Sequence, residues 1–338
     1  MNEDSAAADR VVEATEDGAT EDARASLDAL GTAPAERRTD ALRELRALAD
    51  ERPGRFDGLA AALAPFLTDE ERPVRLTTAK LLVAVAGAEP AAVVPVVEAL
   101  ADRLADDDEF YYVRARSAEA LGYVALEHPD AVASPDVLAD LRIGLAFDEP
   151  EVTEKLAKAL AFVALGDPDR LRHLVGRLAE HLDDDSEFVR YHLCTALAAV
   201  GSTHPERLEA ASGPLVARLD DSDSHVRGRA TEALASLVAA DADASLPAIP
   251  EPADADEDDG DEFAARRMHA LAARVHGEDS PVEASTAEAV GTLESIRETT
   301  EPAVEAMRSP DADGECPHCG LELPDQGPPM CPRCGAPR

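Results

Sequence analysis

Residues Val189–Ala240 read VRYHLCTALAAVGSTHPERLEAASGPLVARLDDSDSHVRGRATEALASLVAA, and they hold two copies of one pattern. A valine followed by an arginine opens each copy, at Val189 and at Val226, with 37 residues from one valine to the next. A leucine stands eight residues after each valine, and Val200 or Leu237 stands eleven residues after it. These three positions fall near one face of a helix with 3.6 residues per turn. Each copy therefore begins with a helix that has one apolar face.

The same pattern extends toward the N-terminus, and its period marks a repeat array. The aligned valines are Val74, Val113, Val152, Val189 and Val226, with separations of 39, 39, 37 and 37 residues. A proline stands sixteen residues after each of the first four valines, at Pro90, Pro129, Pro168 and Pro205. Proline is tolerated in the first turn of a helix, where no backbone N–H bond is lost. Each proline thus predicts the start of a second helix, and each repeat is a helical hairpin.

Fainter copies extend the array at both ends. In a first copy Pro34 takes the place of the valine, 40 residues before Val74, and the copy that starts at Val226 lacks the proline. The array then has about six hairpins and covers residues 23–245. Because one hairpin cannot bury its apolar face alone, neighbouring hairpins must stack to form a core. The pattern predicts an all-α fold, an α-solenoid.

The two-helix repeat, its period and an Asp-rich turn followed by Val-Arg resemble the HEAT repeat family. The resemblance implies a right-handed α-solenoid, and it implies a ladder between adjacent repeats, formed by an Asp in the turn and an Arg early in the first helix. The matching pairs are Asp69/Arg75, Asp108/Arg114, Asp185/Arg190 and Asp221/Arg227. The third repeat departs from this pattern, because Thr153 stands where the Arg is expected.

The chain is strongly acidic, with 32 Lys+Arg against 70 Asp+Glu and a formal net charge of −38. Its only lysines are Lys80, Lys155 and Lys158. This composition resembles that of cytosolic proteins from salt-accumulating halophilic archaea. Near 1 M salt the Debye length is about 3 Å, so the self-repulsion that opposes folding in dilute buffer is screened. We therefore expect a salt-adapted, cytoplasmic protein whose solenoid does not bind nucleic acid.

The N-terminal residues lack the basic and apolar regions of a signal peptide. The stretch Leu81–Val97 is apolar, but it is short and holds Pro90 and Pro95. We expect two buried helices there and no membrane span.

Clusters of acidic residues stand just before several predicted helices. They are Asp106-Asp107-Asp108-Glu109, Asp183-Asp184-Asp185 and Asp220-Asp221-Ser222-Asp223. Asp at a helix start accepts bonds from free backbone N–H groups and interacts well with the helix dipole. The clusters lack the alternating ligands and glycine of a calcium loop. We expect them to cap helices.

The remaining segments differ in composition from the array. Residues 1–22 are acidic and are expected to be disordered, and residues 246–262 form an acidic linker. Residues 263–309 regain helical periodicity. They either cap the solenoid or form tethered helices that bind a partner.

Residues 310–338 carry the strongest chemical signal, two CPxCG motifs that contain Cys316, Cys319, Cys331 and Cys334. In each motif the cysteines bracket a tight turn, and the glycine allows the turn geometry. Four thiolates make a closed tetrahedral site suited to zinc, with no position open for a reactive water. The segment looks like the short zinc ribbons of prokaryotic proteins. We predict one structural Zn²⁺ per chain.

The leading functional hypothesis is a non-enzymatic scaffold that binds a protein partner along the solenoid, with the zinc ribbon as an auxiliary contact. HEAT-like solenoids mostly serve as protein-binding scaffolds. Two alternatives stay open. One is an enzyme or enzyme subunit with a HEAT-like fold, of lyase or hydroxylase type, and the other is a nucleic-acid-associated factor that acts through the ribbon. No catalytic residues are identified, and Cys194 is expected to be a small core residue.

Overall fold

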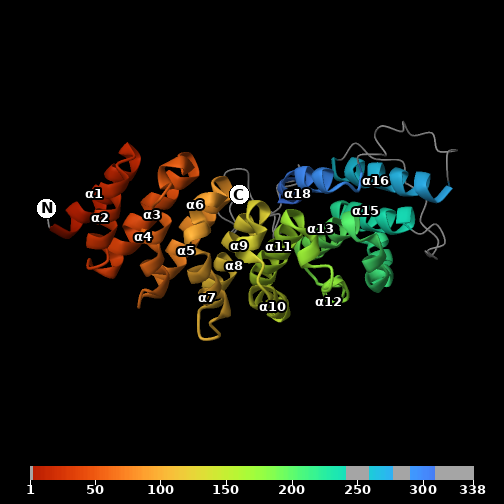
Figure 1. Ribbon diagram of the computed structural model, residues 1–338, viewed down its shortest axis with the longest axis horizontal. Helices are drawn as coiled ribbons and strands as arrows, with labels where there is room; N and C mark the ends of the chain where they lie inside the picture. The colour runs from red at the N-terminus through yellow and green to blue at the C-terminus, as the bar shows by residue number, and fades with distance from the viewer. Residues whose placement is uncertain (1–2, 241–258, 277–289, 309–338) are drawn as a thin grey trace, which may run out of the picture. The chain divides into compact units, whose positions relative to one another are not determined.

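The computed structural model describes residues 3–240, 259–276 and 290–308 (Figure 1). The chain divides into an N-terminal unit, Met1–Ala196, and a C-terminal unit, Leu197–Arg338. Every regular element in the described ranges is an α-helix or a 3₁₀ helix. None of the helices in these ranges is long and apolar enough to cross a membrane.

The first helices of the repeats are regular, and each has 17 residues. They are α3 (Ala35–Glu51), α5 (Arg72–Ala88), α8 (Tyr111–Glu127), α11 (Pro150–Gly166), α13 (Glu187–Thr203) and α15 (Ser224–Ala240). From α5 onward, their starting residues are separated by the 39, 39, 37 and 37 residues that the valines predict. The helical repeat array is therefore confirmed.

The register of the first copy needs a correction of three residues. The helix α3 begins 37 residues before α5, whereas the alignment on Pro34 predicts 40. Pro34 stands just outside α3, as its N-cap residue, so it cannot be the equivalent of a valine in the helix. Arg37 takes that place, and Arg38 becomes the equivalent of Arg75.

The second helices begin at the predicted prolines but are broken into short pieces. In the N-terminal unit they comprise η1 (Pro53–Phe56), α4 (Ala60–Leu63), η2 (Ala64–Thr68), α6 (Pro90–Val93), η3 (Val94–Val96), α7 (Val97–Ala105), α9 (Pro129–Val132), α10 (Pro135–Ile143), η4 (Gly144–Ala146), η5 (Pro168–Arg170) and α12 (Val175–Ala179). Several breaks fall at internal prolines such as Pro65, Pro95 and Pro135. An internal proline removes one helical hydrogen bond and clashes with the carbonyl four residues earlier.

An additional hairpin precedes α3, formed by α1 (Glu3–Asp17) and α2 (Thr20–Leu30). The expectation of disorder over residues 1–22 is therefore wrong for the part that the structure describes, residues 3–22. Both helices bury small or apolar side chains despite their acidic composition, and Val11 and Leu27 are at most 1% exposed. Helix α1 packs against both α2 and α3, so burial of these few residues outweighs the surrounding charge.

The C-terminal unit contains the end of the array and two further helices. After α13 come η6 (Pro205–Ala211), α14 (Ser212–Ala217), η7 (Arg218–Asp220) and α15, followed by α16 (Asp259–His276) and α18 (Leu293–Arg308). Helix α16 packs along α15 and also contacts α18. Its start lies within the predicted linker, and α18 continues through Pro302 to Arg308. This packing is the arrangement expected of a terminal cap.

The ladder between repeats exists in the N-terminal unit with different partners from those predicted. Arg38 Nη2 lies 2.8 Å from Asp69 Oδ1, and Arg75 forms a bidentate pair with Glu109, at 2.7 and 2.9 Å. Each arginine thus pairs with a carboxylate in the turn of the following repeat. In the next rung the Arg114 guanidinium instead lies 5.0 Å from the centre of the Phe147 ring.

Arginines that stand one residue after the aligned valine also bind backbone carbonyls in the turn before their own helix. Arg75 Nη1 donates to Asp69 O at 2.8 Å, and Arg190 Nη1 donates to Asp184 O at the same distance. Arg227 repeats this contact with Asp221 O at 2.9 Å. The predicted pairs Asp69/Arg75 and Asp221/Arg227 therefore meet through a backbone oxygen.

The acidic clusters mainly close the turns between helices, and the predicted capping is seen at Asp223. Asp69, Asp106, Asp184 and Asp221 each use Oδ1 to accept a bond from the backbone N–H two residues later, at 2.9 to 3.1 Å. Asp223 Oδ1 also accepts from Val226 N at 2.9 Å, at the start of α15. Among the described residues, no group of three or more His, Cys, Asp or Glu side chains could hold a metal ion.

Candidate functional site

The first helices present two recurrent polar positions, which we number from the aligned valine. Positions +3 and +6 lie on the same side of a helix, one turn apart. We call these positions on α5, α8 and α11 the first-helix stripe, which consists of Thr77, Lys80, Arg116, Glu119, Lys155 and Lys158. All three lysines of the chain belong to it. The stripe lies entirely within the N-terminal unit.

Glu119 is the buried centre of the stripe. Its side chain is 6% exposed, and its carboxylate lies 2.6 Å from Arg116 Nη1 and 3.7 Å from the Nζ atoms of Lys155 and Lys158. Burial alone would raise the pKa of Glu119, but Lys155, Lys158 and Arg116 together hold this pKa below its ordinary value. Glu119 is therefore ionised when the protein is folded at neutral pH.

Lys158 is held by aromatic side chains as well as by Glu119. Its Nζ donates to Tyr123 Oη at 2.6 Å and lies 4.4 Å from the centre of the Tyr123 ring. The Phe162 ring centre is 5.1 Å away. An ammonium over an aromatic face is attracted by the ring quadrupole, and the attraction is stronger where water is excluded.

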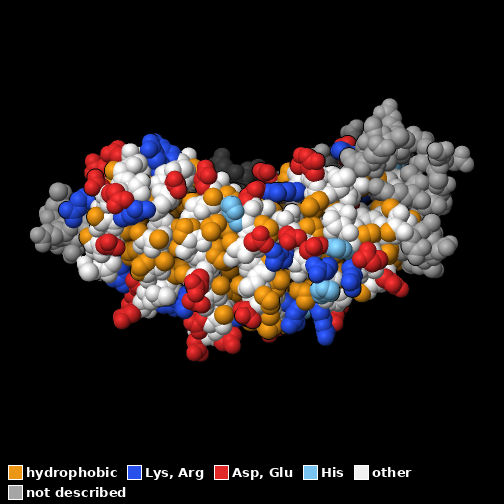
Figure 2. Space-filling view, in the orientation of Figure 1, with side chains coloured by type: hydrophobic (Ala, Val, Ile, Leu, Met, Phe, Trp, Pro, Cys, Tyr) orange, Lys and Arg blue, Asp and Glu red, His pale blue; other side chains and the backbone are white. Residues whose placement is uncertain are grey.

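Three basic side chains of the stripe reach the surface. The Arg116 side chain is 29% exposed and that of Lys155 is 12% exposed, while Lys80 is half-buried. Burial, followed by the nearby charges of Arg116 and Arg46, lowers the pKa of Lys80. The carboxylate of Glu151 acts in the opposite direction, but the pKa of Lys80 stays below its ordinary value. Acidic side chains gather, for example, below α7 at the lower edge of the face drawn in Figure 2. Asp107, which follows α7, has a 94% exposed side chain.

The pKa of Glu119 provides a test of this network. Replacing Lys158 with Met is expected to raise that pKa, because one of the two nearby ammonium groups is lost. Stabilisation by a carboxylate with a lowered pKa is present above its unfolded pKa, about 4.3, and is lost as the pH falls through the folded pKa. The variant should lose this contribution at a higher pH than the native protein.

A ¹³C NMR titration of the glutamate carboxyl groups measures the change directly. Lys80→Met is the matched control, because Lys80 does not contribute to the pKa shift of Glu119. An unchanged Glu119 titration in Lys158→Met would contradict the network.

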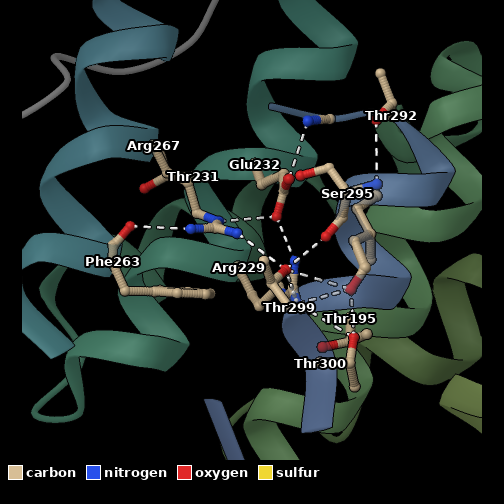
Figure 3. Close-up of polar contacts among 12 residues, drawn as sticks. Thr195, Arg229, Thr231, Glu232, Phe263, Arg267, Thr292, Ser295, Thr299 and Thr300 are labelled. Atoms are coloured by element: carbon tan, nitrogen blue, oxygen red, sulfur yellow. Dashed lines mark hydrogen bonds and ion pairs between the residues drawn. The ribbon is translucent and has the colours of Figure 1, made fainter. Parts of the chain in front are cut away.

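A related cluster lies in the C-terminal unit, where α15 meets α16 and α18 (Figure 3). Glu232 Oε2 accepts from Arg229 Nη1 at 2.6 Å and from Arg267 Nε at 2.9 Å. The side chains of Arg229 and Glu232 are both 0% exposed, and that of Arg267 is 6% exposed. Burial would raise the pKa of Glu232, but Arg229 and Arg267 hold it below its ordinary value. We call these three residues the Arg-Glu-Arg triad.

The triad joins both late helices to the last repeat. Arg229 Nη2 donates to Ile296 O at 3.0 Å and lies 2.9 Å from Thr299 Oγ1 in α18. The backbone N–H of Gly291 donates to Glu232 Oε1 at 2.9 Å. The Arg267 guanidinium also stacks 3.5 Å from the centre of the Phe263 ring. Each charged group of the triad is thereby paired without access to water.

The stripe and the triad share one sequence feature. Arg116 and Glu119 occupy positions +3 and +6 of their repeat, and Arg229 and Glu232 occupy the same positions of theirs, with 2.6 Å between the paired atoms in each case. In the N-terminal unit, the following first helix completes the network with Lys155 and Lys158. In the C-terminal unit, α16 completes it with Arg267.

Helix α16 thus takes the place of a further first helix. Arg267 lies 35 residues after Glu232, and Met268, whose sulfur accepts from Thr231 Oγ1, lies 37 residues after that threonine. The contact between Tyr123 and Lys158 in neighbouring repeats also spans 35 residues. Sequence reasoning missed both networks, although the recurrence of Arg at +3 and Glu at +6 was a usable signal.

The predicted zinc ligands, Cys316, Cys319, Cys331 and Cys334, lie outside the described residues. Cys194 is fully buried in α13, which agrees with its assignment as a core residue. A cavity of about 530 Å³ lies between α1 and α2 and is open to solvent. Alanines such as Ala14, Ala25 and Ala29 contribute to its lining.

Comparisons with known proteins identify the class of fold. No family model and no curated protein matches the sequence. Among solved structures, the designed armadillo repeat protein YIII(Dq)4CqI is similar to this chain with a TM-score of 0.55 and 20% identity, over 62% of this chain and 98% of that one. An engineered protein is similar with a TM-score of 0.56 and 21% identity, over 70% and 97%.

A second designed armadillo repeat protein was solved in complex with the peptide (KR)4. It is similar with a TM-score of 0.55 and 22% identity, over 61% of this chain and 96% of that one. These likenesses show the fold: the chain is a helical repeat solenoid of the armadillo and HEAT-like kind.

Proposed function

We propose that this protein is a non-enzymatic scaffold that binds a protein segment along the repeats of its N-terminal unit. The observation that carries the proposal is the first-helix stripe, in which equivalent positions of successive helices place polar side chains at regular intervals. A periodic surface of this kind suits an extended chain, which contacts one repeat after another. The designed armadillo protein bound to (KR)4 is a precedent for peptide binding by this class of fold.

The composition and the cysteine motifs complete the proposal. The lysine-poor, acidic sequence supports a salt-adapted protein of the cytoplasm, of the kind found in halophilic archaea. Residues 310–338 would form a zinc ribbon that provides a second contact with the partner. Such a tethered contact raises the local concentration of the second site.

Site-specific cross-linking tests where a partner binds. The photoreactive residue p-benzoylphenylalanine replaces Thr77 on the stripe in one protein and Glu180 in another. Glu180 follows α12 and has a 58% exposed side chain. After capture from the host at molar salt, we expect one partner protein cross-linked through position 77 and none through position 180. Equal labelling at both positions, or no protein cross-linked at position 77, would contradict the proposal.

Metal analysis of the full-length protein tests the ribbon. We expect one zinc per chain, and we expect the double variant Cys316→Ser, Cys319→Ser to contain none, because a site with two thiolates left cannot complete the tetrahedral set. The helical circular dichroism should stay close to that of the native protein. Cys194→Ser is the control and should keep its zinc. Stoichiometric zinc in the double variant would refute the assignment of these ligands.

A further inference from the structure

The surface of the stripe carries the opposite charge from the chain as a whole. Its half-buried charged groups, Lys80, Arg116 and Lys155, are all basic. Arg116 and Lys155 pair with Glu119 and Glu154, whose side chains are only 6% and 8% exposed. The exposed Glu151 attracts Lys80. Apart from Glu151, the negative groups therefore lie beneath the positive groups. This is unexpected on a protein with a net charge of −38.

Three acidic groups in the turns before α5 and α8 do not neutralise this surface, because they have other partners. Asp69 and Asp106 accept backbone N–H groups in their own turns, and Glu109 pairs with Arg75. None of the described contacts of these three residues reaches Lys80, Arg116 or Lys155. The four basic groups of the stripe, Lys158 included, still outnumber Glu119, Glu151 and Glu154, so a carboxylate from outside the chain is the complementary group for the excess positive charge.

The spacing of the cations indicates how such carboxylates must be arranged. Lys80, Arg116 and Lys155 come from α5, α8 and α11, which pack side by side in that order. Packed helices are about 8–10 Å apart, and an extended chain rises about 3.3 Å per residue. Carboxylates three residues apart in an extended peptide therefore match neighbouring first helices.

One half-buried aromatic ring, that of Tyr123, lies against Lys158 of the stripe. Gly87 is exposed at the end of α5, and a Cβ atom at this residue would lie 3.6 Å from the ring of Tyr123. Because residue 87 has no side chain, α5 places only backbone against this part of the half-buried ring. The ring offers an apolar contact to a peptide that lies along the stripe.

We propose that the first-helix stripe binds an extended acidic peptide segment of a partner protein, with carboxylates at about every third residue. The inference rests on the proposed scaffold function and names its partner class. The basic peptide of the armadillo complex has the opposite charge. A nucleic acid also offers anions, but a long polyanion is repelled by the net charge of −38, whereas a short peptide carries few charges.

Fluorescence anisotropy with synthetic peptides tests the proposal on the full-length protein. The probe is a labelled Gly/Ser peptide with glutamate at every third residue, and its counterparts carry glutamine instead, or the same glutamates in one block. We expect binding of the spaced glutamate peptide, weaker binding of the block peptide and none of the glutamine peptide. Equal binding of all three peptides would overturn the proposal.

Variants of the protein assign the binding to the stripe. The triple variant Lys80→Gln, Arg116→Gln, Lys155→Gln should bind the spaced peptide about tenfold more weakly, since exposed ion pairs contribute about 0.5 kcal/mol each. The control Arg52→Gln, Arg172→Gln, Arg177→Gln removes the same charge at other exposed positions and should bind like the native protein. If the triple variant unfolds, the single variant Lys80→Glu, at a half-buried site, replaces it. This variant should also bind the spaced peptide more weakly than the native protein. Native affinity in the stripe variants would overturn the proposal.

Two further probes separate this inference from the proposed function. If (KR)4 or an oligothymidylate binds the native protein and the acidic peptide does not, the acidic-peptide inference is wrong. Cross-linking from position 77 to a partner would then still uphold the scaffold function. If no partner cross-links at position 77 and no acidic peptide binds, both proposals fail.

Discussion

Replacing Glu232 with alanine is expected to destabilise the C-terminal unit by about 3–5 kcal/mol. The substitution leaves Arg229 and Arg267 buried next to each other without the carboxylate that neutralises them, and the backbone N–H of Gly291 loses its acceptor. Urea denaturation followed by circular dichroism at molar salt measures the loss. Hydrogen exchange should also accelerate in α16 and α18, because both are attached through this triad.

The matched control is Glu262→Ala on α16, the helix that carries Arg267. Glu262 pairs with Arg266 at 2.9 Å, but both side chains are about 60% exposed, so the loss should not exceed about 1 kcal/mol. The folded pKa of Glu232 is lowered, so its stabilising contribution is complete above the unfolded pKa and disappears as the pH falls through the folded pKa. Similar losses in the two variants would show that the triad does not hold the cap.

Replacing Gly166 with alanine is expected to destabilise the N-terminal unit by about 2–3 kcal/mol. Gly166 ends α11 where it crosses the C-terminal turn of α8, and a Cβ atom there would overlap the carbonyl oxygen of Ala125. The same atom would lie 3.2 Å from Leu126 Cα. These are backbone atoms, which cannot rotate away as a side chain could, so the two helices must separate.

Gly54→Ala in the same unit is the control, since a Cβ at residue 54 meets nothing within 4 Å. It should leave stability unchanged or raise it by up to about 1 kcal/mol through reduced freedom of the unfolded chain. Thermal unfolding of the two variants at molar salt provides the comparison. Equal stability of Gly166→Ala and the native protein would mean that α8 and α11 are not this close.

The sequence predicted the first helices well because their signal is local. Each needs only the 3.6-residue period and the valine register, and all from α5 to α15 lie where the register places them. The second helices were less predictable, because prolines such as Pro95 both permit and interrupt them. The N-terminal hairpin was missed because its composition is acidic, whereas its stability depends on a few buried residues such as Val11 and Leu27.

The networks of buried charge were harder to predict, because their partners are distant in sequence. Nothing near Glu232 in the sequence points to Arg267, which follows a segment of different composition. The ladder shows the same difficulty on a smaller scale. The turn sequence suggested Asp108 for the rung, but its neighbour Glu109 is the residue that meets Arg75. Which of two adjacent carboxylates points toward a neighbouring repeat is a matter of tertiary packing.

Because α16 packs on α15, the last of the first helices, the way in which the array ends does not depend on the number of repeats before it. The terminating helix recognises two side chains on one face of the last repeat, and Arg116 and Glu119 present the same two side chains in the middle of the array. The closing helix thus docks on a pair of residues that a repeat within the array also carries. Repeats could be gained or lost upstream without redesign of the closing helix.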